Sequence, residues 1–471
     1  MTLIFSNHRF QYEVERLFRN FINEPGIKLS TDKADAQGDF CLTEKVGYPG
    51  GAELSVELVR GGKRFCMSRS VPDEMPDKEQ ERELCVLLYK ALRECTGRDL
   101  PWGILTGVRP VKVLSKLTDA QAMQSLLVSP RKLAIARRIE QVQKPLAESI
   151  PENSFSLYVS IPFCPTRCSY CSFVSHSVNS AAARLDEYLA RMVEEMRQLS
   201  TISRRLVPDM IYFGGGTPTV LSADQLKMLF AALECFDLSH IREFTVEAGR
   251  PDTITPEKLE AIKAAGVGRI SVNPQTMNDS VLKAIGRSHD SRQTEEAFLM
   301  ARETGFDVIN MDLIAGLPTD TFDSFAASLD AVCGLSPENI TVHSLSLKRA
   351  AALFHEDQSG AVGETERMID YAHQKLAEHG YIPYYLYRQK NTADNQENTG
   401  YAKPGTESLY NTYIMEELQT ILAVGAGAST KLVDRRTGRI KRITNHKYPY
   451  EYLDRFDDIL ENKREIFGFF V

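Results

Sequence analysis

The sequence lacks the features that mark a membrane or secreted protein. It contains no uninterrupted run of about 20 apolar residues, the length that a helix needs to cross a bilayer. Its start, MTLIFSNHR, does not have the basic and then apolar order of a signal peptide. We therefore expect a globular protein that stays in the cytoplasm and has no membrane partner.

An excess of positive charge is also absent. Lys and Arg together number 56 against 63 Asp and Glu, which gives a formal net charge of −7. Proteins that bind nucleic acid over a broad face usually carry the opposite balance. We expect no nucleic-acid partner, although a local basic pocket could still hold a small acidic ligand.

The nine cysteines do not form a disulfide framework. Three of them share one short segment, and the other six are scattered along the chain without regular spacing: Cys41, Cys66, Cys85, Cys95, Cys235 and Cys333. An odd number without a framework is typical of a reducing compartment. With 471 residues, of which 43% are hydrophobic, the chain is long enough for two or three domains.

The three clustered cysteines are the most informative feature. Residues 158–171 read YVSIPFCPTRCSYC, which places Cys164, Cys168 and Cys171 at C-x3-C-x2-C spacing after an apolar, β-branched run. A four-iron cluster is normally held by four cysteines, so three thiolates leave one iron open to another ligand. The alternative is a structural zinc site completed by His176 or a distant cysteine. Zinc loops usually come as two paired short elements, which this sequence lacks, so it favours the cluster.

From residue 155 onward, short β-rich runs alternate with helical patterns. The predicted strands are 157–161, 210–213, 243–248, 269–273, 308–314 and 340–347, with helices such as 184–199, 223–235 and 256–265 between them. Ser222 is expected to cap the start of the second of these helices and Thr255 the start of the third. This alternation predicts an α/β fold in which six units form a partial barrel. Working groups in such barrels lie at the carboxyl ends of the strands.

Three regions follow from these patterns. Residues 1–150 are expected to be a mixed α/β region of unknown role, with helices at 11–21 and 78–95 and strands at 52–59 and 63–68. Residues 151–390 hold the barrel, and residues 391–471 form a C-terminal extension that we expect to cover the substrate. Within the extension, 391–406 is polar and punctuated by Gly and Pro, which predicts a loop, and 450–463 has an acidic helical pattern.

The cysteine spacing, the aromatic residue before the third cysteine and the preceding strand resemble the signature of radical S-adenosylmethionine (SAM) enzymes. The resemblance implies a [4Fe-4S] cluster whose open iron is chelated by the amino and carboxylate groups of SAM. It further implies that an electron from the cluster splits SAM into methionine and a 5′-deoxyadenosyl radical. The electron would come from a donor such as a flavodoxin or ferredoxin.

Further residues match the SAM site of the coproporphyrinogen-oxidase-like group within that family. The run IYFGGGTPT follows the second strand and is similar to the motif that holds the amino group of SAM, which implies Gly214, Gly215, Gly216 and Thr217 as contacts. Polar residues after later strands match the ribose, carboxylate and adenine-side contacts of that group: Glu247, Gln275, Arg287 and Asp312. Tyr158 matches the tyrosine of its L-Y-x-x-I-P-F-C segment and is implied at both the SAM and the catalytic site.

The N-terminal segment GILTGVRP at 103–110, with YRQKN at 387–391 and ENTGY at 397–401, resembles the HemZ branch of this group. That branch implies oxygen-independent coproporphyrinogen III dehydrogenase activity. Two propionate side chains of a porphyrinogen substrate would be oxidatively decarboxylated to vinyl groups, giving protoporphyrinogen IX.

One departure keeps two alternatives open. Established oxygen-independent oxidases have a fourth cysteine two positions after the third, where this chain has Phe173, as the related haem chaperones do. Those chaperones also carry an H-N-x-x-Y-W motif in the C-terminal half, which this chain cannot contain because its one tryptophan is Trp102. The sequence favours an enzyme over a haem-binding chaperone, and a haem-modifying radical SAM methyltransferase on the same scaffold stays open as an alternative.

Basic residues near the ends of later segments suggest how an acidic macrocycle would be held. Arg349, Arg388 and Lys390 follow predicted strands, and guanidinium groups bind carboxylates in a bidentate manner. The tyrosines of 384–387 could flank a flat ring. The same residues could instead form a solvated surface. His343 is expected to be an interior or strand-face histidine, and a proton relay is its less favoured role.

Overall fold

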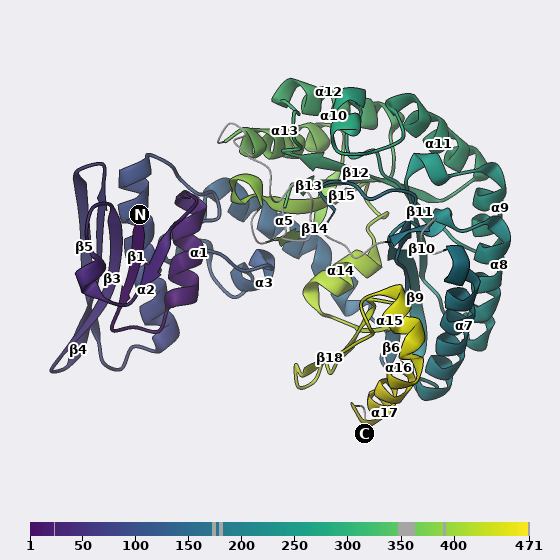
Figure 1. Cartoon of the computed structure of the whole chain (residues 1–471), viewed down its shortest axis with the longest axis horizontal. Helices are drawn as coiled ribbons and strands as arrows, with labels where there is room; N and C mark the ends of the chain where they lie inside the picture. Colours follow the sequence, from purple (N-terminus) through teal and green to yellow (C-terminus); the bar gives the residue numbers. More distant parts are fainter. Residues whose placement is uncertain (23, 172–175, 179–181, 347–362, 390–391, 470–471) are drawn as a thin grey trace. The chain divides into compact units, whose positions relative to one another are not determined.

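The structure is a computed structural model of the chain, and it describes residues 1–471 except 23, 172–175, 179–181, 347–362, 390–391 and 470–471. The chain divides into two compact units, Met1–Arg138 and Ile139–Val471 (Figure 1). The three regions expected from the sequence, bounded at 150 and 390, stay a prediction.

The first unit is a five-stranded sheet with helices. Its strands are β1 (Thr2–Ser6), β2 (Lys28–Ser30), β3 (Phe40–Tyr48), β4 (Gly51–Arg60) and β5 (Lys63–Pro72), in the order β2-β1-β3-β4-β5. β1 is parallel to both of its neighbours, and β3, β4 and β5 are antiparallel. The helices are α1 (Gln11–Phe21), α2 (Asp77–Thr96), α3 (Pro110–Leu114), α4 (Asp119–Ser125) and the start of α5 (Pro130–Glu148).

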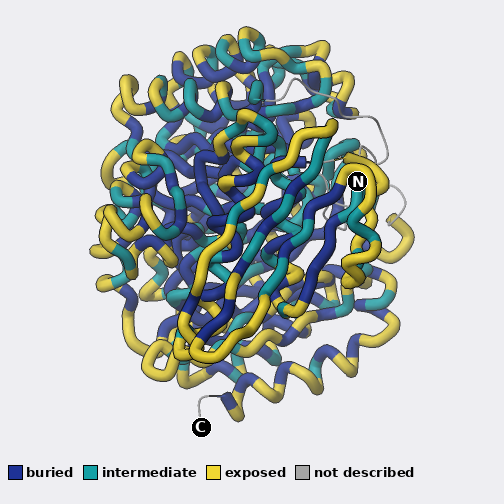
Figure 2. Tube along the Cα trace, turned by 90° about the vertical axis from the view of Figure 1, so that its left-hand side faces the viewer, coloured by how far each residue is buried: buried dark blue, intermediate teal, exposed yellow. Residues whose placement is uncertain are grey.

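The core of this unit is built from side chains that recur every three or four residues in the helices and every second residue in the strands. In α1 the buried residues Val14, Leu17, Phe18 and Phe21 recur every three or four positions, which places them on one face. In β4 every second residue from Ala52 to Leu58 is buried. α2 packs on α1, β4 and β5. In Figure 2, which colours the chain by burial, buried and exposed positions can be followed along the strands. The two helices and two strands predicted for this unit are therefore confirmed.

The second unit contains the six predicted parallel strands. They are β6 (Ser154–Ile161), β9 (Val207–Gly215), β10 (Glu243–Gly249), β11 (Arg269–Val272), β12 (Val308–Ala315) and β13 (Asn339–Ser344), which neighbour one another in chain order. The helices after them are α7 (Leu185–Ile202), α8 (Ala223–Ala232), α9 (Pro256–Ala264), α10 (Asp279–Ala284), α11 (Ser291–Thr304), α12 (Phe322–Leu335) and α13 (Glu364–Glu378). The ribbon of Figure 1 shows α7, α8, α9 and α11 along the outside of the curved sheet, which is the expected partial-barrel architecture.

Local sequence sets the starts of these helices. The Ser222 side chain accepts a hydrogen bond from the amide of Gln225, and the Gln225 side chain bonds back to the cap, which makes a capping box at the start of α8. The Thr255 side chain caps α9 in the same position, and Pro256 occupies the first helical turn. Both caps were predicted from the sequence.

One predicted loop is a strand. The polar segment 391–406 was expected to be irregular, but β15 (Glu397–Ala402) lies between β13 and β14 (Ile382–Arg388), antiparallel to both. All six residues of β15 are buried. Two of their polar side chains are paired inside the protein: the Asn398 side chain accepts from the amide of Ser344 at 3.1 Å, and Glu397 lies 2.8 Å from His373. Because these partners come from segments far apart in the chain, the polar composition of 391–406 did not reveal that part of the segment is a buried strand.

The C-terminal segment extends the other edge of the same sheet. β16 (Thr420–Val424) pairs in parallel with β6, and β17 (Ser429–Val433) and β18 (Ile440–Thr444) continue the sheet in antiparallel fashion. α14 (Leu409–Glu416) precedes these strands. The predicted acidic helix at 450–463 is two helices, α15 (Pro449–Asp454) and α16 (Phe456–Lys463), separated by Arg455 and followed by α17 (Glu465–Phe469).

A buried ion pair connects these C-terminal elements to the barrel. Lys463 of α16 and Glu195 of α7 are 1% and 0% exposed, and their charged groups lie 3.2 Å apart. Glu195 also accepts hydrogen bonds from the amide of Gly425 at 2.8 Å and from the hydroxyl of Tyr452 at 2.7 Å. The carboxylate thus holds the turn after β16 against α7.

Within the described residues, no helix combines the length and apolar character needed to cross a membrane.

Replacement of Lys463 tests this buried pair. Lys463→Met leaves the Glu195 charge uncompensated inside the protein, and we expect a loss of about 3–5 kcal/mol in the free energy of unfolding. Urea denaturation measures the loss. Lys227, whose side chain is 63% exposed, provides the matched control, and Lys227→Met should change stability by less than about 0.5 kcal/mol. Equal stabilities of the two variants would contradict a structural role for the pair.

Candidate functional site

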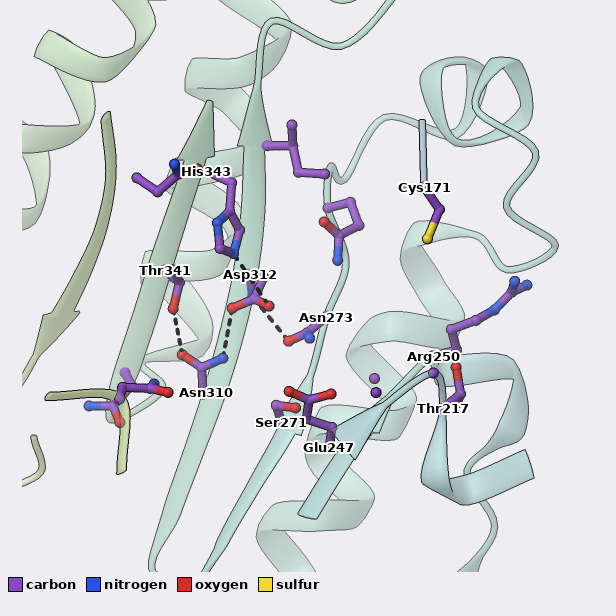
Figure 3. Close-up of a pocket in the computed structure, with 18 of the residues that line it drawn as sticks. Cys171, Thr217, Glu247, Arg250, Ser271, Asn273, Asn310, Asp312, Thr341 and His343 are labelled. Carbon is purple, nitrogen blue, oxygen red and sulfur yellow. Dashed lines mark hydrogen bonds and ion pairs between the residues drawn. The ribbon is translucent and has the colours of Figure 1, made fainter. Parts of the chain in front are cut away.

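The carboxyl ends of the six parallel strands surround a cavity of about 410 Å³. Most of the site residues predicted from the sequence line it: Tyr158, Cys164, Cys168, Cys171, Gly215, Gly216, Thr217, Glu247, Gln275, Arg287 and Asp312. Figure 3 shows part of this lining, with Cys171 and Thr217 on one side and Asp312 and His343 on the other. The fold therefore brings residues from six separate strand ends to one site.

The three thiols reach the cavity from one short loop. The loop begins with β7 (Phe163–Cys164), directly after β6, and the amide of Cys171 donates to the carbonyl of Cys168 at 3.1 Å. The Thr217 hydroxyl donates to the Cys164 sulfur at 3.5 Å, which connects the loop to the glycine motif. Phe173 lies outside the described residues. Three thiols on one loop fit a cluster with an open iron.

His176, a zinc ligand in the alternative interpretation, lies away from this lining. It belongs to β8 (His176–Ser177), and its ring meets those of Tyr448 and Tyr450 edge to face. It is not among the described residues that line the cavity with the three cysteines. The structure therefore does not place His176 with the three cysteines at the cavity, as a zinc site completed by this histidine would require.

The glycine motif ends β9 against the start of the cysteine loop. A Cβ at Gly216 would lie 2.5 Å from the carbonyl oxygen of Phe163, and one at Gly214 would lie 2.9 Å from the Glu247 carboxylate. The amide of Gly216 donates to the carbonyl of Ile161 at 2.7 Å, which requires this close approach. Gly215 has a φ of +104°. The backbone here forms a cradle that any larger side chain would fill.

Glu247 lies beside this cradle with two tyrosines. It accepts a hydrogen bond from the Tyr212 hydroxyl at 2.5 Å. The Tyr212 ring stacks on Tyr410, with centroids 4.2 Å apart, and Tyr158 lies alongside both. Burial raises the pKa of Glu247 to about 7, with a further contribution from the nearby Asp312. An acidic group with this pKa changes its ionisation near neutral pH.

Asp312 is the centre of a polar network on β12 and β13. Its carboxylate lies 3.7 Å from the ring of His343 and accepts from the Asn310 side chain at 2.8 Å. The Thr341 hydroxyl in turn donates to Asn310 at 3.1 Å (Figure 3). Burial acts to raise the pKa of Asp312, but His343 and Asn310 outweigh it, and the net shift is downward. Asp312 is therefore held as an anion in the cavity wall.

Gln275 is placed by backbone contacts with the neighbouring strand. Its amide donates to the carbonyl of Asp312 at 2.9 Å, and its own carbonyl accepts from the amide of Ile314 at 2.9 Å. It adopts a φ of +69°, a left-handed conformation that is uncommon for a residue with a side chain. The two bonds hold Gln275 beside Asp312 at the cavity wall.

Arg287 has unused hydrogen-bonding groups. The residue is half-buried, and one terminal nitrogen donates to the Tyr170 hydroxyl at 3.0 Å. Its Nε and Nη1 atoms have no hydrogen-bond partner within the described residues. Buried donors of this kind are costly unless a ligand satisfies them, and a guanidinium prefers a carboxylate. The residue fits the carboxylate of SAM.

Several residues of the site were not predicted: Thr166, Tyr170, Tyr212, Arg250, Asn273, Asn310 and Thr341. His343, expected to be an interior or strand-face histidine, lies on β13, lines the cavity and is partly exposed. Asn310 and Asp312 on β12, and Thr341 and His343 on β13, are polar residues two positions apart. Because side chains two apart share one face of a strand, this alternation could have predicted a polar strand face at the site. No comparable pattern in the sequence marks Arg250.

The part of the cavity wall that β14 contributes is rich in tyrosine. Tyr384, Tyr385 and Tyr387 of β14 line it. Arg388 is buried, is not among the described lining residues, and donates to the carbonyl of Asn395 at 3.2 Å. Arg349 and Lys390 lie outside the described residues. Carboxylate anchoring by these three basic residues stays a prediction.

Comparisons with known proteins agree with this geometry. Residues 158–332 match the Radical SAM superfamily, whose members use a [4Fe-4S] cluster and SAM. The chain is 40% identical, over 82% of its length and 81% of the relative, to the oxygen-independent coproporphyrinogen-III oxidase-like protein HemZ of Bacillus subtilis. It is 34% identical to the heme chaperone HemW of the same organism, over 62% of this chain and 74% of the chaperone.

Among solved structures, the coproporphyrinogen III oxidase HemN of Escherichia coli has a similar fold. The TM-score is 0.54 at 23% identity, covering 68% of this chain and 72% of that one. Together, the superfamily match and the extent of similarity to HemZ show that this chain belongs to the radical SAM superfamily, in the HemZ branch of the oxygen-independent coproporphyrinogen III oxidase-like group.

Proposed function

We propose that this protein is an oxygen-independent coproporphyrinogen III dehydrogenase, which converts two propionates of coproporphyrinogen III to vinyl groups and yields protoporphyrinogen IX. The observation that carries the proposal is the convergence of three thiols, the glycine cradle, Arg287 and Asp312 on one cavity with a tyrosine-rich end. The name of the Bacillus relative supports the substrate class.

The cavity residues fit the two cofactors by their chemistry. Cys164, Cys168 and Cys171 would hold the cluster as thiolates. Arg287 has two free donors for a carboxylate, and the backbone of Gly214–Gly216 leaves room for the amino end of SAM. Glu247 offers acceptor oxygens suited to ribose hydroxyls. Gln275 and Asp312 complete the wall on the adenine side.

When bound, the cluster and SAM supply a carbon radical that removes one hydrogen atom from the β-carbon of a propionate. The propionate then loses CO2 and passes one electron to an acceptor, which leaves the vinyl group. The chain must hold that carbon within contact distance and keep water away. The buried tyrosines of β14 provide an apolar wall with polar tips for a flat macrocycle.

Two other functions remain on the same scaffold. The heme chaperone HemW is similar over most of its length, but the chain cannot contain the H-N-x-x-Y-W motif that resemblance assigns to those chaperones, because Trp102 is its one tryptophan. A methyltransferase acting on haem would use the same cluster. The tests below separate these functions.

We infer that the protein works in the cytoplasm with a flavodoxin or ferredoxin as electron donor. The nine cysteines, all within the described residues, form no disulfide, as expected in a reducing compartment. A cluster with an open iron also needs protection from oxygen.

The cysteine assignment is tested by iron content. Cys164→Ala, Cys168→Ala and Cys171→Ala should each lose the cluster, whereas the wild type should hold about four irons per chain after anaerobic reconstitution. Cys235 is exposed and outside the loop, so Cys235→Ala is the matched control. About one zinc and no iron in the wild type would overturn the assignment.

We expect the affinity for SAM to depend on pH through the ionisation of Glu247. If the ionised carboxylate accepts the ribose hydroxyls, affinity falls as pH drops through its pKa of about 7. The ionised fraction changes about tenfold between pH 8 and pH 6, and we expect an equal change in affinity by anaerobic calorimetry. Glu247→Gln should bind more weakly and with little pH dependence. The exposed residue Glu296 supplies the control Glu296→Gln. An unchanged pH profile in Glu247→Gln would remove Glu247 from the ribose site.

The overall reaction is tested with coproporphyrinogen III, SAM and a low-potential reductant under anaerobic conditions. We expect 5′-deoxyadenosine and protoporphyrinogen IX to form together, with about two SAM consumed per product because each propionate needs its own hydrogen abstraction. Cys168→Ala should form neither. If SAM is cleaved while coproporphyrinogen is recovered unchanged and haem is altered, the haem-modifying alternative takes its place. Haem binding without any SAM cleavage would indicate a chaperone.

A further inference from the structure

The cysteine loop is bonded by an arginine, Arg250, that the family resemblance does not assign. The Nη1 atom of Arg250 donates to both the carbonyl oxygen of Thr166, at 3.1 Å, and its hydroxyl, at 2.8 Å. Thr166 lies between Cys164 and Cys168, in the longer gap of the cysteine motif. Arg250 thus bonds the loop where no cysteine anchors it.

The end of β10 directs Arg250 toward the loop. The pairing of β10 with β11 shifts register between Glu247 and Gly249, which is a β-bulge, and Gly249 has a φ of +63°. Bulges of this kind turn the next side chain out of the strand direction, and a left-handed residue there favours glycine. The carbonyl of Arg250 then accepts from the amide of Thr253 at 3.0 Å and from its hydroxyl at 2.8 Å.

The guanidinium itself is held in one orientation. Its Nε and Nη2 atoms donate to the two carboxylate oxygens of Asp252 at 3.0 and 2.9 Å, so the pair is bidentate. The side chains are 4% and 17% exposed. On the other side of Asp252, the ring of His289 lies 3.6 Å away and is fully buried. This geometry leaves Nη1 as the nitrogen that points to Thr166.

The opposite side of the loop is held by the segment that carries His289. The amide of Ser169 donates to the carbonyl of Ile285 at 3.1 Å, and Arg287 bonds to Tyr170. The loop is therefore held at Thr166 by Arg250 and at Ser169 and Tyr170 by residues 285–287. Three thiolates brought together repel one another, and the guanidinium of Arg287 beside the loop offsets part of that repulsion.

We propose that Arg250, oriented by its bidentate pair with Asp252, is a positioning residue that presents the cysteine loop in its cluster-binding form. The proposal rests on the proposed role of the three cysteines as cluster ligands. Groups that orient metal ligands typically change metal affinity by about 10–100-fold when removed. Lysine cannot replace this arginine, because one ammonium group cannot bind a carboxylate in bidentate fashion and a carbonyl in fixed geometry.

The first test uses the protein without its cluster. Hydrogen–deuterium exchange of the peptide 162–171 should be about tenfold faster in Arg250→Ala than in the wild type, because the loop opens more readily. Thr166→Val, which removes only the hydroxyl contact, should give a smaller increase. Arg292→Ala, at an arginine that is 75% exposed, is the matched control and should exchange like the wild type. Equal exchange in all four proteins overturns the proposal.

The second test uses anaerobic reconstitution with iron and sulfide. Arg250→Ala and Asp252→Asn should retain about one tenth of the wild-type iron at limiting iron. Arg250→Lys should recover only part of it and give an altered electron paramagnetic resonance spectrum of the reduced cluster. Wild-type iron content and spectrum in Arg250→Ala overturn the proposal. If Arg250→Ala does not fold by circular dichroism, Thr166→Val decides by the same measurements.

The iron content of the wild type separates a failure of the cluster assignment from a failure of the positioning role of Arg250. A wild type that takes up no iron overturns the cluster assignment and the proposed function, while the exchange experiment still reports on the loop. A wild type that holds about four irons, with unchanged Arg250 variants, overturns only the positioning role.

Discussion

The site depends on the close backbone contact between the ends of β6 and β9. The amides of Gly216 and Thr217 donate to the carbonyls of Ile161 and Phe163 at 2.7 and 2.8 Å, at the point where the chain enters the cysteine loop. A Cβ at Gly216 would collide with both carbonyls. This contact sets the position of the first cysteine relative to the cradle, so the predicted cluster ligands and the predicted SAM residues are held in fixed positions relative to one another.

Around this contact, buried polar groups are arranged by pairs. Arg250 is paired with Asp252, Asp312 with His343, and Lys463 with Glu195. Each charge has its own partner inside the protein, which avoids the cost of an isolated buried ion. Arg287 differs, because two of its nitrogens have no hydrogen-bond partner within the described residues. The group left unsatisfied is the one whose chemistry suits an anionic ligand.

The C-terminal extension is part of the same sheet. β16 pairs with β6 beside the cysteine loop, and Ser160 of β6 donates to the carbonyl of Ala426 after β16. On the far side, β14 and β15 continue the sheet from β13 and bring the tyrosines to the cavity. The tyrosine-lined part of the cavity is therefore built from segments distant in the chain from the cysteine motif.

The sequence by itself determined the local features: the six parallel strands, the helix caps at Ser222 and Thr255, and the motifs that contain the cysteines and glycines. These depend on periodicity and short spacings, which neighbouring residues decide. Only the tertiary structure decided that β15 is a strand, that His343 faces Asp312, and that Arg250 bonds Thr166 across 84 residues. The physical reason is that buried polar pairs form between segments far apart in the chain, and local composition contains no record of the partner.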